Sequence, residues 1–163
     1  MRIIAGTHRG KKLIEYYAPT TRPTTDRVKE NVFNLLSNYV DFKGLRVLDL
    51  FAGTGAYGIE CLSRGAGYVS FNDNDQTAIN VIKKNIGQIW QNYSISKKDY
   101  LSAINSKYDL IFLDPPYDSD YGRRAIDVIQ SGLIVFETDR EFSHPQIIEA
   151  RRYGRAWVYL IQK

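Results

Sequence analysis

Residues 49–58 read Asp-Leu-Phe-Ala-Gly-Thr-Gly-Ala-Tyr-Gly, and this loop indicates the class of fold. It follows a short apolar run at Arg46–Leu50, which predicts a strand, and it leads into a predicted helix at Tyr57–Arg64. Its glycines at positions 53, 55 and 58 form a G-x-G-x-x-G pattern. Such a loop turns the backbone tightly and brings a helix N-terminus close to a ligand, but the pattern alone does not choose the ligand.

Strands and helices alternate along the chain from this loop onward. The strands have apolar runs on both faces, which is typical of a parallel sheet covered by helices on each side. We therefore predict a doubly wound α/β fold, with a last strand at Arg155–Ile161 that runs antiparallel at or near the sheet edge. The other predicted strands are Tyr68–Asn72, Tyr93–Ser96, Leu110–Leu113 and Leu133–Glu137, and the other helices are Gln76–Gln88, Tyr100–Asn105 and Arg123–Gln130.

An acidic residue, Asp73, follows the second predicted strand, twenty positions after Gly53. A carboxylate at this place accepts hydrogen bonds from both hydroxyls of a ribose, which predicts a cofactor that contains a nucleoside. Both NAD and S-adenosylmethionine meet that condition. Asp49 at the end of the first strand favours S-adenosylmethionine, because a carboxylate suits an ammonium and a sulfonium better than a pyrophosphate.

A second unusual loop, Asp114-Pro115-Pro116-Tyr117, directly follows the strand Leu110–Leu113. The two prolines fix the backbone φ angles and supply no N–H group. The Asp114 carboxylate and the Pro115 carbonyl are placed to accept the two hydrogens of an exocyclic amine, which favours the pyramidal nitrogen that attacks a methyl group. Tyr117 is expected to stack on an extruded base.

The N-terminal thirty residues carry all of the formal net charge of +4, with seven basic and three acidic side chains against fifteen of each in residues 31–163. Short β-prone runs at Arg2–Ala5 and Lys11–Tyr16 flank a glycine-containing turn and predict a hairpin. A basic end on a neutral body favours contact with a polyanion, and a solvated basic edge is the alternative. A helix with its apolar face from Val28 to Val40 follows, capped by Thr24 or Thr25.

The length of 163 residues leaves room for one domain. No apolar run approaches the ~18–20 residues that cross a bilayer, and none follows Met1 to act as a secretion signal. One cysteine, Cys61, forms no internal disulfide, and with two histidines it makes no zinc site unaided. We expect a reducing, cytoplasmic location, no membrane and no metal.

With both loops in view, the chain resembles the amino methyltransferases that carry a (D/N)-P-P-(Y/F) signature. It resembles still more closely the bacterial 16S ribosomal RNA guanine-N2 methyltransferases that modify guanine 966. The resemblance implies the class I S-adenosylmethionine-dependent fold, a Rossmann-like, mostly parallel seven-stranded sheet with helices on both faces and a reversed terminal hairpin. It is carried by residues 2–6, 9–13, 22–30, 49–58, 62–66 and 114–117.

The resemblance also implies the activity, which is methyl transfer from S-adenosylmethionine to the N2 amine of a guanine in 16S ribosomal RNA or the small ribosomal subunit. It implies an N-terminal hairpin extension at residues 1–22 that touches RNA, and a methyltransferase domain at residues 23–163. The implied residues are Asp114, Pro115, Pro116 and Tyr117 for catalysis; Asp49, Phe51, Ala52, Gly53, Thr54, Gly55, Asp73, Asn74 and Asp99 for the cofactor; and Arg2, Arg9, Lys11, Lys12, Arg22 and Arg27 for RNA.

One departure and two rival functions remain at this point. The family usually shows Glu-x-Asp after the second strand, whereas this chain has Asn72-Asp73-Asn74-Asp75, so the acid reaches one carbon less far. A DNA adenine-N6 methyltransferase shares the second loop, but it normally carries a separate target-recognition region. A non-catalytic RNA-binding protein with a vestigial cofactor fold would keep the basic hairpin. We expect a monomer.

Overall fold

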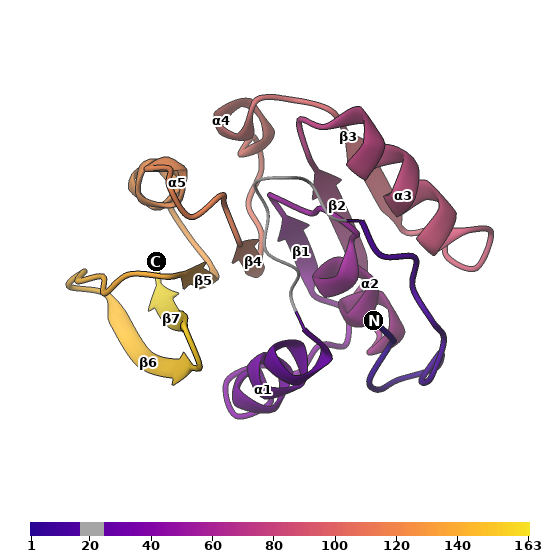
Figure 1. Cartoon of the computed structure of the whole chain (residues 1–163), viewed down its shortest axis with the longest axis horizontal. Coiled ribbons are helices and arrows are strands. Elements are labelled where there is room, and N and C mark those ends of the chain that lie inside the picture. The colour runs from indigo at the N-terminus through magenta and orange to yellow at the C-terminus, as the bar shows by residue number, and fades with distance from the viewer. Residues whose placement is uncertain (17–24) are drawn as a thin grey trace.

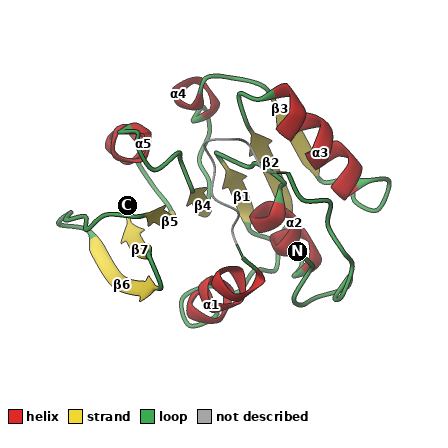
Figure 2. Cartoon of the chain, in the orientation of Figure 1, coloured by secondary structure: helices red, strands yellow, loops and turns green. Residues whose placement is uncertain are grey.

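The computed structural model describes residues 1–16 and 25–163. Every strand and helix predicted between residues 46 and 138 is present, with ends that agree within two residues. Figures 1 and 2 show their arrangement. In chain order the elements are α1 (Asp26–Leu36), β1 (Arg46–Asp49), α2 (Ala56–Ser63), β2 (Tyr68–Asn72), α3 (Gln76–Ile86), β3 (Tyr93–Ser96), α4 (Tyr100–Ala103), β4 (Leu110–Leu113), α5 (Tyr121–Val128), β5 (Leu133–Thr138), β6 (Ile147–Tyr153) and β7 (Ala156–Gln162).

The strands form one seven-stranded sheet in the order β3-β2-β1-β4-β5-β7-β6. Neighbours from β3 to β5 are parallel, whereas β7 is antiparallel to both β5 and β6. The winding reverses between β1 and β4, which lie side by side, so the loops that leave their carboxyl ends meet at the place where open α/β sheets bind ligands. This order confirms the predicted doubly wound fold.

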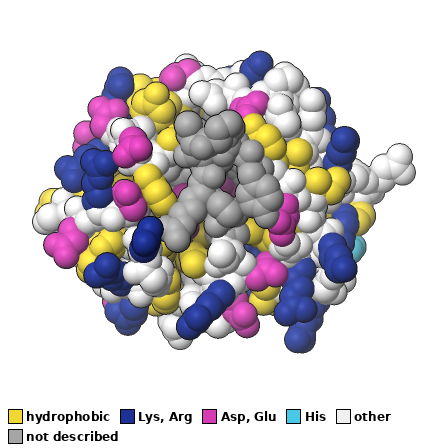
Figure 3. All heavy atoms as spheres, in the orientation of Figure 1, with side chains coloured by type: hydrophobic (Ala, Val, Ile, Leu, Met, Phe, Trp, Pro, Cys, Tyr) yellow, Lys and Arg dark blue, Asp and Glu magenta, His cyan; other side chains and the backbone are white. Residues whose placement is uncertain are grey.

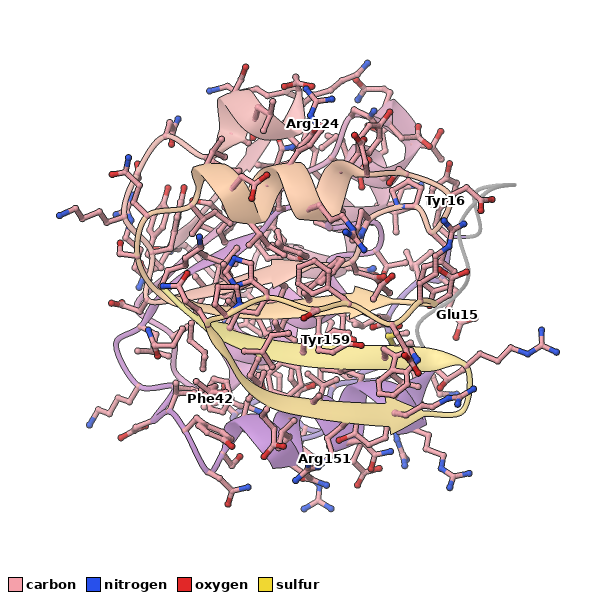
Figure 4. The ribbon with its side chains drawn as sticks, turned by 90° about the vertical axis from the view of Figure 1, so that its left-hand side faces the viewer. Glu15, Tyr16, Phe42, Arg124, Arg151 and Tyr159 are labelled. Atoms are coloured by element: carbon pink, nitrogen blue, oxygen red, sulfur yellow. The ribbon has the colours of Figure 1, made fainter. Side chains whose placement is uncertain are left out.

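The side chains of successive strand residues pack alternately into two separate hydrophobic cores, one on each face of the sheet. Val47 packs in the core with α1, α2 and α3, and the next residue, Leu48, packs in the core with α4 and α5. Figure 4 shows the sheet nearly edge-on, with α5 on one side and α1 on the other. Both faces are therefore covered, and this explains why the central strands are continuous apolar runs.

The strand β6 is absent from the strands predicted by the residue pattern, which treats the residues beyond Ser143 as a polar stretch before a last strand. The seven strands and reversed terminal hairpin that the resemblance implies are confirmed. β6 is an edge strand whose side chains are mostly half-buried or exposed, including exposed Ile148 and Arg151. Because only one of its faces meets the core, it carries no apolar run to identify it. The last strand, β7, is antiparallel as predicted and lies one position inside the edge.

The predicted N-terminal hairpin is reduced to one β-bridge, between Arg2 and Lys12. The backbone of Ile3 donates to Lys11 at 2.9 Å, and Gly10 donates back to Ile3 at 2.8 Å. The strands stop there because the next two amides of the chain turn toward α2. The turn presses on α2 so closely that a Cβ at Gly6 would lie 1.8 Å from the carbonyl oxygen of Ser63.

A buried carboxylate on α2, Glu60, receives those two amides. Its oxygens accept the backbone N–H groups of Ile4 at 2.8 Å and Ala5 at 2.9 Å. It also pairs with the fully buried ammonium of Lys29 from α1, at 3.3 Å, and with the guanidinium of Arg64, at 2.9 Å. Glu60 thus joins the N-terminal segment to two helices.

Helix α1 begins as predicted and ends earlier. Thr25 is its N-cap and accepts the backbone N–H of Val28 at 3.3 Å, with Asp26 in the first turn. The other predicted cap, Thr24, lies outside the described residues. The helix ends at Leu36, where the side chain of Ser37 bonds the carbonyl of Phe33 at 2.8 Å, and the predicted extension to Val40 is a turn.

Candidate functional site

A cavity of about 360 Å³ opens at the carboxyl ends of the parallel strands. It receives residues from the loops after β1, β2, β3 and β4, so these loops come together at one edge of the sheet. The lining consists of Leu50, Phe51, Asn72, Asn74, Lys98, Asp99, Tyr100, Leu101, Pro116, Tyr121 and Arg124. Four residues singled out from the sequence are therefore at the cavity wall: Phe51, Asn74, Asp99 and Pro116.

The glycine loop has the backbone that its sequence predicts. Gly53 and Gly55 have φ angles of 54° and 78°, and Gly55 is the N-cap of α2. Gly58 lies against the sheet, because a Cβ there would meet the Phe71 ring at 2.3 Å. The loop is also held from outside by Asn85, whose side chain donates to the Thr54 carbonyl at 3.0 Å. Ala52, Gly53, Thr54 and Gly55 are outside the set of residues that line the cavity.

The two aspartates of the predicted cofactor site support this loop from beneath. Asp49 is buried and accepts the backbone N–H of Gly58 at 2.9 Å. Burial raises the pKa of Asp49 to about 7. Asp73 accepts the amides of Gly53 at 2.8 Å and Asp75 at 2.9 Å, and burial raises its pKa as well. Neither carboxylate is among the lining residues named above, and both accept backbone amides of the loop.

An aromatic cluster that the sequence analysis missed forms one wall of the cavity. The rings of Phe51, Tyr100 and Tyr121 lie 4.9–6.4 Å apart, centroid to centroid. Tyr100 directly follows Asp99, the residue expected to contact the adenine amine. That neighbouring position could have identified Tyr100 as a cavity residue from the sequence. Within the part of the chain that the structure describes, the Tyr100 hydroxyl is buried and has no hydrogen-bond partner.

These features test whether the site fits S-adenosylmethionine. Aromatic faces suit an adenine ring, and the unpartnered hydroxyl of Tyr100 supplies a polar atom that a purine nitrogen would satisfy. Exposed Asp99 at the rim caps α4 through the Leu101 amide, at 3.0 Å, and keeps acceptor capacity for an exocyclic amine. The residues present fit this cofactor.

The loop after β4 also contributes to this cavity, beside the loop after β1 at the place where the winding of the sheet reverses. Pro116 lies in the cavity wall, and its carbonyl accepts the Ser119 backbone N–H at 3.1 Å and hydroxyl at 2.6 Å, which closes a turn. Asp114 is half-buried and Pro115 is buried. The half-buried Tyr117 donates its hydroxyl to Glu137 at the end of β5, at 3.3 Å.

The basic residues predicted to contact RNA divide into two groups. Arg2, Arg9, Lys12 and Arg27 are exposed. Lys11 is half-buried: its ammonium donates to the Asn85 carbonyl at 3.0 Å and lies 5.3 Å from the centre of the Trp90 ring. Arg22 lies outside the described residues. Figure 3 shows basic side chains gathered at the lower right, over the N-terminal segment of Figure 1.

Among residues 1–16 and 25–163, no helix is long and apolar enough to span a membrane. In the same part of the chain, no cluster of three or more His, Cys, Asp or Glu side chains is arranged to hold a metal ion. Cys61 is buried and burial raises its pKa well above the usual value, which suits core packing rather than nucleophilic chemistry.

The sheet order, the glycine loop and the Asp-Pro-Pro-Tyr loop together define a class I S-adenosylmethionine-dependent methyltransferase. A model of the family described as Conserved hypothetical protein 95 matches residues 1–162. The chain belongs to that family, and the resemblance seen in the sequence is confirmed at this level.

Relatives and solved structures agree with this assignment. The chain is 37% identical to YlbH of Bacillus subtilis, over 91% of this chain and 88% of the relative. It is 36% identical to ribosomal RNA small subunit methyltransferase D of Haemophilus influenzae, over 86% of this chain and 80% of the relative. The solved structure of yhhF from Escherichia coli matches with a TM-score of 0.84 and 29% identity, over 100% of this chain and 97% of that one.

Proposed function

We propose that this protein transfers a methyl group from S-adenosylmethionine to the N2 amine of a guanine in 16S ribosomal RNA, at the position of guanine 966. The observation that carries the proposal is the Asp-Pro-Pro-Tyr loop beside the cavity that fits the cofactor. The name of the Haemophilus influenzae relative, a ribosomal RNA small subunit methyltransferase, supports the RNA substrate.

When bound, S-adenosylmethionine supplies a methyl group on a positively charged sulfur. The protein's task is to present the nitrogen. The Asp114 carboxylate and the Pro115 carbonyl accept the two hydrogens of the guanine N2 amine, which directs the nitrogen lone pair toward the methyl group. The Asp114 carboxylate would also accept the proton that the guanine nitrogen releases on methylation. Pro116 shapes the loop, and Tyr117 stacks on the base after it is extruded.

The cofactor is held in this proposal by both the cavity wall and the loop behind it. Phe51, Asn74 and Asp99 are at the wall, where Asp99 would accept a hydrogen bond from the adenine amine. Backbone groups of the glycine loop approach the cofactor, and Asp73 accepts the ribose hydroxyls through the acceptor sites that its backbone bonds leave. The buried Asp49, with its pKa raised to about 7, is partly ionised at neutral pH, and a cationic ligand would favour its charged form. The remaining loop residues of this set are Ala52, Gly53, Thr54 and Gly55.

The N-terminal region, residues 1–22, is the RNA contact in this proposal, and residues 23–163 form the methyltransferase domain. Arg2, Arg9, Lys12 and Arg27 are exposed and available for phosphates. The Lys11 ammonium donates to the carbonyl of Asn85 in α3, so its charge lies against that helix. We place the enzyme in the cytoplasm with its substrate, acting as a monomer on ribosomal RNA or the small subunit.

The test is methylation of three acceptors with labelled S-adenosylmethionine: unmodified small ribosomal subunits, their free RNA, and duplex DNA. Digestion to nucleosides identifies the methylated base. We expect N2-methylguanosine from the ribosomal samples and no label in DNA. N6-methyladenine in the DNA would instead assign a DNA adenine methyltransferase, and RNA binding without any transfer, with the cofactor bound, would assign a non-catalytic RNA-binding protein.

A further inference from the structure

Glu137 is a buried carboxylate that the proposed chemistry does not use. It contacts the loop Asp114–Tyr117, which we call the base-binding loop. Glu137, near the end of β5, is only 5% exposed. One of its oxygens accepts the hydroxyl of Tyr117 at 3.3 Å, and the other accepts the hydroxyl of Tyr57 at 2.9 Å. A buried charge is costly unless it is hydrogen-bonded, so these two bonds help to hold the carboxylate in place between the two tyrosines.

The first partner, Tyr57, is a fixed anchor. It lies in the first turn of α2, two residues after the glycine that caps the helix, and it is buried. Its ring stacks on Phe112 of β4, with centroids 4.8 Å apart and planes 12° from parallel. Burial raises the pKa of Tyr57 well above its usual value, so its hydroxyl keeps its proton and donates to Glu137.

The second partner, Tyr117, is contacted at its hydroxyl by a residue from outside its own loop. The chain leaves β4 at Leu113 and turns at Pro116, whose carbonyl bonds to Ser119 rather than to Tyr117. Tyr117 is half-buried. The bond from its hydroxyl to Glu137 fixes the far end of the side chain.

We infer that Glu137 is a positioning residue that holds the Tyr117 ring in the orientation that receives the target base, and ties that ring through Tyr57 to the helix of the cofactor loop. This inference rests on the proposed function, because it takes Tyr117 as the stacking residue. The hydrogen-bonded series Tyr117–Glu137–Tyr57 joins the loop after β4 to α2, so base and cofactor are aligned by one rigid unit.

The experiment measures kcat and the KM for each substrate in variants that remove single atoms of this series. Tyr117→Phe keeps the stacking ring and removes only the hydroxyl. We expect it to lower kcat by about tenfold to a hundredfold, the effect of losing a hydrogen bond to a charged group, and to leave the KM for S-adenosylmethionine unchanged. Glu137→Leu is expected to cause at least the same loss, and Glu137→Gln, which keeps an acceptor oxygen, is expected to restore part of the rate.

The double variant Tyr117→Phe/Glu137→Leu decides between positioning and a merely structural role. If Glu137 acts through the Tyr117 hydroxyl, the double variant is no slower than Glu137→Leu alone. The matched control is Tyr108→Phe, which removes another tyrosine hydroxyl, bonded to Ser70 at 3.4 Å and remote from the base-binding loop, and which is expected to keep the wild-type kcat. Thermal unfolding of each variant corrects the rates for the folded fraction.

Two results would overturn the inference: a wild-type kcat in folded Tyr117→Phe, or losses in the double variant that multiply as independent effects. Failure of the proposed function is a different result. It is seen in the wild-type protein, as methylation of another base or as no transfer. If the wild type methylates another base, the same single and double variants are compared on that base, and the comparison still tests the role of Glu137.

Discussion

Replacing Glu60 with leucine is expected to destabilise this protein by about 3–5 kcal/mol, far more than the loss of an ordinary ion pair. The reason is the surroundings of its partner. Lys29 has an exposed fraction of zero, so water cannot replace the carboxylate. Among residues 1–16 and 25–163, the Arg2 carbonyl would be the one hydrogen-bond acceptor left to its ammonium. An exposed pair such as Arg140 with Asp118 contributes about 0–1 kcal/mol by comparison.

The assay is urea unfolding of wild type and variant, supported by thermal melts. For a chain of this length the expected loss corresponds to roughly 6–20 °C in Tm. Burial lowers the pKa of Lys29, and Glu60 opposes that effect. Without Glu60 the folded state therefore binds the Lys29 proton less well than the unfolded chain does, so the variant should gain stability as the pH rises toward 10. Native-state hydrogen exchange should also show faster exchange at the amides of Ile4 and Ala5, which lose their acceptor.

The matched control is the double variant Lys29→Met/Glu60→Leu, which replaces the pair with apolar side chains of similar size. It should be more stable than Glu60→Leu alone by at least about 1 kcal/mol, because no buried charge is left unpaired. A Glu60→Leu loss below about 1 kcal/mol, or a double variant less stable than the single one, would refute the reasoning.

Three further predictions concern the proposed site. Burial raises the pKa of Asp49 to about 7 against a usual 3.8, so the contribution of Asp49 to stability should fall by about 4 kcal/mol as the pH rises from about 4 to about 7. Asp49→Asn should lack this part of the pH dependence in urea unfolding, and a curve parallel to that of the wild type would contradict the prediction. Asp114→Ala should abolish methyl transfer and keep S-adenosylhomocysteine binding by calorimetry, whereas lost binding would contradict its role. Arg9→Ala and Lys12→Ala should each weaken RNA binding and lower the slope of log K against log salt by about 1, while an unchanged slope would mark them as solvated surface.

The central strands were predictable because burial on both faces leaves its mark in each strand's own sequence. The strand Leu110–Leu113 is buried on both faces, and such a strand must be an apolar run whatever lies around it. The edge strand Ile147–Tyr153 was not predictable on that basis, since one of its faces meets solvent and its residues include Glu149 and Arg151. The predicted length of the N-terminal hairpin was wrong for a different reason. Glu60 takes two of its amides from more than fifty residues away in the chain, and no local pattern reports that contact.

The site shows the same division between local and distant causes. Both loops follow strand ends, so sequence alone places them at one edge of the sheet. The aromatic wall was missed because Tyr100 and Tyr121 belong to different helices and meet only in three dimensions. Glu137 was read as the end of an ordinary strand, and its two tyrosine partners are 20 and 80 residues away along the chain.

Asn85 shows why the basic N-terminal segment behaves as part of the body rather than as a tail. Its side chain accepts the Ile14 amide at 2.7 Å and donates to the Ile14 and Thr54 carbonyls, both at 3.0 Å, while its own carbonyl accepts the Lys11 ammonium. One buried amide therefore fastens the segment and the glycine loop to the same point on α3. The exposed charges of the segment are consequently set at defined distances from the cofactor loop. Under the proposed function, such an arrangement selects an RNA whose phosphates match those distances when the target base is in the pocket, which a flexible basic tail would not do.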